Sequence, residues 1–105
     1  MFPQGKMGKM LAKAQKAQAK IQEDIAALRV EGSSGGGIVK ALVDGNKTVL
    51  DLVISAEALE DATPAEVADL VLAAITDAQR KAQAEVEKKM NDLAGMLGLP
   101  PGMGL

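Results

Sequence analysis

Apolar residues recur every three or four positions near the start of the chain. This spacing places them along one stripe of an α-helix and is close to the heptad spacing of a coiled coil. The stripe predicts a long amphipathic helix over residues 8–28, with Gln18 as its polar member. Its apolar members are Met7, Leu11, Ala14, Ile21, Ile25 and Leu28. A helix of this kind needs a second apolar surface to cover its stripe.

Five lysines form another row on the same predicted helix, and they also recur at steps of three and four residues. In heptad terms they occupy the positions that face away from the apolar stripe. This lysine row consists of Lys6, Lys9, Lys13, Lys16 and Lys20. A linear array of positive charge matches the phosphate backbone of a nucleic acid, although lysines on a helix often only form its solvated face.

The charge of the chain is unevenly distributed. Residues 1–29 contain six Lys and Arg against two acids, a net charge of +4, whereas the remainder carries −6. The first acid is Glu23, so the first four members of the lysine row have no carboxylate within one helical turn. We therefore interpret the lysine row as available to an external partner.

The middle of the chain predicts a small antiparallel sheet. Residues 38–43 and 48–54 are rich in β-branched side chains, and residues 44–47 between them have hairpin-turn composition. Residues 28–31 are expected to supply a third strand. The Gly- and Ser-rich residues 32–37 predict a turn or mobile loop, and no Gly-Lys-Ser/Thr follows them, as a phosphate-binding loop would require.

A second long helix has a clear start signal. Thr63 can cap it, Pro64 suits the first helical position, and Glu66 stands where a capping box needs an acid. The apolar stripe is wide over residues 67–78 and narrows to about one residue per turn beyond them. We therefore expect a helix that packs on the sheet and then runs past it, so that both long helices form protruding arms.

The second helix also carries basic residues, which are secondary candidates for binding. Acids precede two of them by four residues, in the pairs Asp77–Lys81 and Glu85–Lys89, so a salt-bridged surface is the better interpretation there. These secondary candidates are Arg80, Lys81, Lys88 and Lys89.

The composition predicts one small α+β domain over residues 1–97 and a flexible Gly- and Pro-rich tail over residues 98–105. Only one residue of the 105 is aromatic, so the core is thin, and a second copy is expected to cover the exposed apolar stripes. We therefore expect a homodimer. The N-terminus lacks the apolar core of a signal peptide, and no segment is apolar enough to span a membrane, which predicts a cytoplasmic protein.

The chain contains no His, Cys, Trp or Tyr. The usual general bases, nucleophiles and metal ligands are therefore largely missing, and we expect no enzyme, no cofactor, no metal site and no small-molecule substrate. Single-strand binders stack bases on aromatic rings, and this chain has only Phe2. The expected nucleic-acid partner is therefore the phosphate backbone of a duplex. We expect little recognition of bases, because lysine acts as a point charge.

Two other functions fit parts of the pattern. The apolar stripe of the first helix could capture a helix of another protein, with the lysines serving only solubility. The same helix could also lie on anionic lipid, but its apolar face contains Ala14 and Gln18 and lacks an interior Trp or Phe, so we expect no membrane partner.

Several short motifs together resemble the YbaB/EbfC family of nucleoid-associated proteins. They are the Met-Phe-Pro start, Leu-Arg-Val-Glu-Gly at 28–32, Val-Lys-Ala-Leu-Val-Asp-Gly at 39–45, Ile-Ser-Ala-Glu-Ala-Leu at 54–59 and Leu-Pro-Pro-Gly at 99–102. The resemblance implies an α-β-β-β-α protomer whose three-stranded antiparallel sheet carries the helical arms of a homodimer. It also implies that the arms bind DNA and alter its conformation, with roles in nucleoid organisation, DNA protection and gene regulation. This chain lacks a basic tail.

Overall fold

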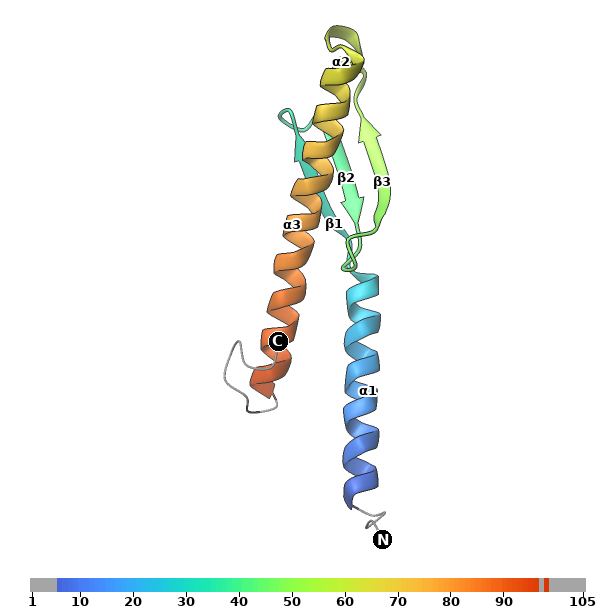
Figure 1. The fold of residues 1–105 in the computed structure, drawn as a ribbon, viewed down its shortest axis with the longest axis vertical. Coiled ribbons are helices and arrows are strands. Elements are labelled where there is room, and N and C mark those ends of the chain that lie inside the picture. Colours follow the sequence, from blue (N-terminus) through green and yellow to red (C-terminus); the bar gives the residue numbers. More distant parts are fainter. Residues whose placement is uncertain (1–5, 97, 99–105) are drawn as a thin grey trace.

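The computed structural model describes residues 6–96 and residue 98. The elements, in chain order, are α1 (Lys6–Ala27), β1 (Val30–Ser34), β2 (Val39–Val43), β3 (Val49–Ile54), α2 (Ala56–Asp61) and α3 (Pro64–Met96). The strands form one antiparallel sheet in the order β1-β2-β3 (Figure 1). The predicted α+β class with two long helices and three strands is confirmed. The short helix α2 was not predicted.

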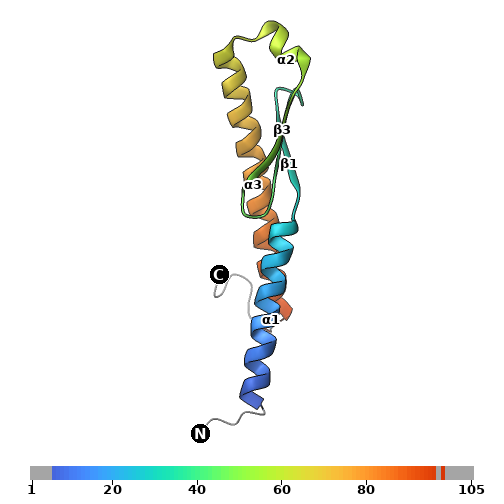
Figure 2. The same ribbon diagram turned by 90° about the vertical axis from the view of Figure 1, so that its right-hand side faces the viewer.

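Helix α3 packs on one face of the sheet, so that helix and sheet form two layers (Figure 2). Alternate residues of β2 point into this interface, and Val39, Ala41 and Val43 are buried. They meet small residues of α3, namely Ala74, Ala78 and Ala82, which are also buried. Small side chains on both sides allow the helix and the sheet to approach closely.

Strand β1 approaches α3 closely at Gly32. A Cβ atom added at Gly32 would lie 2.1 Å from the amide nitrogen of Ala78. Strand β1 therefore begins and ends later than predicted: it covers Val30–Ser34 instead of residues 28–31, and Gly32 pairs with Ala41. The predicted loop shrinks to a turn over Gly35–Gly37, where all three glycines have positive φ.

Strand β3 is left largely uncovered by α3, which lies mainly over β1 and β2. Leu52 pairs with the buried Ala41 and shares its face, yet Leu52 is 37% exposed. Val49, Leu50 and Val53 are more exposed still. The uncovered strand forms one edge of the sheet, with a register irregularity between Leu42 and Val43.

The start of α3 has the predicted capping box. The amide of Glu66 donates to the hydroxyl oxygen of Thr63 at 3.2 Å, and the amide of Thr63 donates to the Glu66 carboxylate at 3.2 Å. This reciprocal pair satisfies two amides at the helix N-terminus. The helix then continues for 33 residues, well past the end of the sheet.

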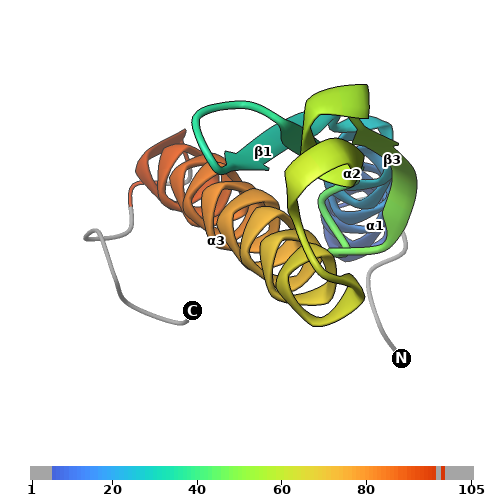
Figure 3. The ribbon, with the colours of Figure 1, turned by 90° about the horizontal axis from the view of Figure 1, so that it is seen from above.

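Helices α1 and α3 extend beyond the sheet in the same direction as two protruding arms (Figure 1). Viewed from above, they are separate rods (Figure 3). The protein is correspondingly elongated, with extents of 71 × 23 × 16 Å. The predicted tail lies outside the described residues except for Gly98. No helix within residues 6–96 has the length and apolar character that crossing a bilayer requires.

Candidate nucleic-acid interface

Helix α1 is joined to the body of the protein at its C-terminal end. Ile25 is the one buried residue among the described side chains of α1. Its carbonyl oxygen accepts hydrogen bonds from the amides of Leu28, at 3.1 Å, and Gly45, at 3.0 Å. The second bond fixes the end of α1 against the turn between β2 and β3. The remaining turns of α1 project away from the sheet and are mostly exposed.

That turn is itself held by α3. The side chain of Lys47 hydrogen-bonds Gln83, and the Gln79 amide group donates to the Lys47 carbonyl oxygen at 3.1 Å. Lys47 has a φ of 68°, so its backbone is in the left-handed region. Residues from three segments therefore position the base of α1. No local pattern predicted these contacts, because the partners lie more than 30 positions apart.

The lysine row follows the exposed length of α1. Lys9, Lys13, Lys16 and Lys20 are all exposed, and Lys6 begins the helix, although its side chain lies outside the described part. At about 1.5 Å per residue the row spans roughly 21 Å along the helix axis. A row of that length can span several phosphates of a duplex backbone.

Members of the lysine row differ in their partners. Lys20 forms an ion pair with Asp24 at 3.0 Å, and this hydrogen bond raises the pKa of Lys20. Lys9, Lys13 and Lys16 form no ion pair with any residue that the structure describes. These three lysines therefore present uncompensated charge, as their distance from the first acid predicted.

Lys13 also borders a groove between the two arms. This arm groove has a volume of about 640 Å³, and α3 contributes Met90 and Leu93 to it. The α1 residues that line it are Met10, Lys13, Ala14, Ala17, Gln18 and Ile21. The expectation that the lysine row faces away from the apolar stripe was wrong for Lys13, which lines the groove together with the stripe members Ala14, Gln18 and Ile21.

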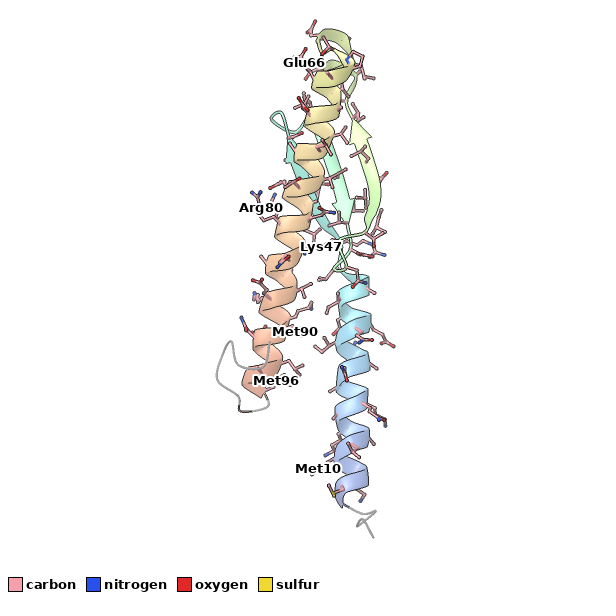
Figure 4. The ribbon with its side chains drawn as sticks, viewed as in Figure 1. Met10, Lys47, Glu66, Arg80, Met90 and Met96 are labelled. Atoms are coloured by element: carbon pink, nitrogen blue, oxygen red, sulfur yellow. The ribbon has the colours of Figure 1, made fainter. Side chains whose placement is uncertain are left out.

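The basic residues of α3 form a separate group. Arg80, Lys81 and Lys88 are exposed, and Lys89 is half-buried. Arg80 projects from the side of α3 that is turned away from α1 (Figure 4). The structure therefore does not join Arg80 to the lysine row in one continuous patch.

Of the two ion pairs predicted on α3, one is present. Lys81 pairs with Asp77 at 3.0 Å, whereas Glu85 and Lys89, both described, form no ion pair. Asp77 also accepts a 3.0 Å hydrogen bond from the backbone amide of Ser33. The Ser33 amide, and after it Lys81, lower the pKa of Asp77. Asp77 thus links α3 to β1, a role that the sequence did not reveal.

Comparisons with known proteins agree with this architecture. The chain is 39% identical over 101 residues to a nucleoid-associated protein of Agrobacterium fabrum, covering 96% of this chain and 94% of the relative. It is also 39% identical over 99 residues to a nucleoid-associated protein of Rhodopseudomonas palustris, covering 94% and 93%.

A solved structure shares the fold. It is that of an uncharacterized protein from Helicobacter pylori, with a TM-score of 0.64 at 23% identity, covering 92% of this chain and 98% of that one. The profile of the YbaB/EbfC DNA-binding family matches residues 3–97. This chain therefore belongs to the YbaB/EbfC DNA-binding family.

Proposed function

We propose that this protein is a nucleoid-associated protein that binds duplex DNA by laying the lysine row of α1 against backbone phosphates. The observation that carries the proposal is the linear array of exposed lysines on a projecting arm. Lys9, Lys13 and Lys16 have no ion-pair partner among the described residues, so they are free to replace the cations that are condensed on backbone phosphates. Lys6 and Lys20 extend the array at its two ends.

The mode of binding follows from the type of side chain. Lysine offers a flexible point charge, whereas arginine presents the planar fork that reads guanine edges. Binding is therefore expected to depend weakly on base sequence. Arg80, Lys81, Lys88 and Lys89 are proposed as secondary contacts, because Lys81 is already paired with Asp77 and Arg80 faces away from α1. Such binding would change the conformation of the DNA and organise, protect and regulate it within the cytoplasmic nucleoid.

We further propose that the protein acts as a homodimer. Strand β3 is an edge strand, and it exposes apolar residues that α3 does not cover, namely Val49, Leu50, Leu52 and Val53. A second copy of the same strand offers the matching backbone groups and the matching apolar side chains. Dimerisation would bring two lysine rows to one duplex and double the number of phosphate contacts.

The test compares two variants that change the net charge by the same amount. Lys16→Glu reverses one charge within the lysine row, and Lys40→Glu reverses one exposed charge elsewhere. Each protein is titrated against an unrelated 30-base-pair duplex in a gel-shift assay at fixed low salt, and circular dichroism confirms the fold.

The lysine-row variant should lose affinity by about tenfold or more, whereas the matched variant should change by less than about threefold, because phosphate contacts act locally. Equal losses in both variants would show that only net charge matters and would reject the lysine row as the binding surface.

A further inference from the structure

The arm groove is an apolar feature that the two arms leave open. Six of its eight lining residues are apolar, and Lys13 and Gln18 are the exceptions. Met10, at one end, is 70% exposed, and Met90 and Leu93 face the groove from the last turns of α3. Within the described residues no segment fills this space. Any segment that covers these apolar side chains removes them from water and thereby stabilises the folded protein.

The end of α3 lies beside this groove. Helix α1 extends past the described end of α3, so its first turns face no described element (Figure 1). Gly98 has a φ of 76°, and its amide donates to the Gly95 carbonyl oxygen at 3.1 Å. A left-handed glycine of this kind ends a helix and turns the chain off its axis. Gly98 follows the groove-lining Leu93 by five residues.

We propose that residues 99–105 of the same chain occupy the arm groove and brace α1 against α3. This segment, Leu-Pro-Pro-Gly-Met-Gly-Leu, has no charged side chain and contains three large apolar ones. Its two adjacent prolines prevent a helix and favour an extended chain. An apolar, uncharged segment matches the apolar lining of the groove.

The segment is long enough to reach every lining residue of α3. Seven extended residues span about 22 Å at roughly 3.1 Å per residue. Met90 lies eight residues before Gly98, which is about 12 Å along the helix. The segment can therefore fold back past Met90 or continue along α1 toward Met10. Either path places its large apolar side chains between the arms, where they would fix the spacing of the two helices.

The first test measures the accessibility of single thiols, since the chain has no cysteine. Ala17 lines the groove, whereas Ala19 is exposed about 200° further round the same helix and does not line it. Ala17→Cys and Ala19→Cys are each labelled with a maleimide, in the otherwise native chain and with Leu99→Ser/Met103→Ser added.

The apolar-to-serine changes should speed labelling at residue 17 by at least about fivefold and leave residue 19 unchanged, because only residue 17 is covered by the segment. The same labelling rate at residue 17 with and without those changes would overturn the proposal.

The second test identifies the occupant by disulfide formation. Met103→Cys is combined with Ala17→Cys or, as the matched control, with Ala19→Cys, and both are oxidised and run on non-reducing gels. The proposal expects an intramolecular disulfide with residue 17 at least about tenfold faster than with residue 19. Covalent dimers as the main product would assign the groove to a second copy, and equal rates would show no docking. Neither test contains DNA, so its failure leaves the proposed DNA binding unaffected.

Discussion

The backbone amide of Gly45 donates a 3.0 Å hydrogen bond to the carbonyl oxygen of Ile25. This bond joins the β2–β3 turn to the last turn of α1. The residue that accepts it, Ile25, is buried. The position requires glycine, because a Cβ at residue 45 would lie 2.4 Å from that oxygen and 2.6 Å from Cγ2 of Ile25. The direction of the α1 arm is therefore set at a contact that leaves no space for a larger residue.

Replacing Gly45 by alanine should weaken this contact. The added methyl group forces the turn and α1 apart, and we expect the free energy of unfolding to fall by about 1–3 kcal/mol. Urea unfolding followed by circular dichroism measures the change. Gly8→Ala is the control on the same helix, since a Cβ there meets nothing within 4 Å. It should stabilise the protein by up to about 1 kcal/mol, and a similar loss in both variants would contradict the tight contact at Gly45.

Gly32→Ala should have a larger effect, because the atoms that the new Cβ would meet belong to the backbone of α3. They include the carbonyl oxygen of Ala74 at 2.6 Å as well as the amide nitrogen of Ala78. Relief requires β1 and α3 to separate, and a loss of about 3 kcal/mol or more is expected. Gly95→Ala, in an open part of α3, should be neutral or stabilising. Thermal unfolding of both variants tests the close packing of β1 on α3.

The Asp77 carboxylate should make stability depend on acidic pH. Its pKa is lowered by the Ser33 amide and then by Lys81, so its stabilisation is fully present above the unfolded-state pKa near 3.8 and is lost as pH falls through the lower folded-state value. Asp77→Asn should therefore lower the urea midpoint at pH 7, and this difference should shrink progressively as pH falls below about 4. Lys81→Met keeps the Ser33 hydrogen bond, so it should retain most of the pH dependence. A difference that persists at low pH would contradict this assignment.

Thr63→Ala should remove one half of the capping box at the start of α3. The amide of Glu66 loses its acceptor, and stability is expected to fall by about 1 kcal/mol. Thr63→Ser keeps the hydroxyl group and should lie close to the wild type. Differential scanning calorimetry on the three proteins measures the effect, and equal losses for serine and alanine would show that the hydroxyl bond contributes little.

The sequence predicted those features that arise from neighbouring residues. The capping box at Thr63 and the spacing of the lysine row are local, and both long helices appear where their periodicity placed them. The position of β1 was not predictable in this way. Its residues Gly32–Ser34 have little strand propensity, and they form a strand because they pair with β2 under α3.

Other parts of the site depend on tertiary structure and carried no local signal. Ser33 and Asp77 are 44 residues apart, and nothing in either neighbourhood indicates their hydrogen bond. Lys13 borders the arm groove because the fold brings Met90 and Leu93 of α3 to the same groove, more than 75 positions along the chain. The Glu85–Lys89 ion pair was predicted from local spacing but is not formed, although the structure describes both residues. Correct spacing on an exposed helix does not ensure that two flexible side chains meet.

We propose that the lysine row binds duplex DNA by replacing counterions along the phosphate backbone. A titration of the wild-type protein with an unrelated duplex at salt concentrations from about 50 to 200 mM measures this replacement. If four or five lysines of one arm contact phosphates, log affinity should fall against log salt with a slope of about −4 for that arm, and a second arm should make the slope steeper. A slope near zero would rule out this mode of binding.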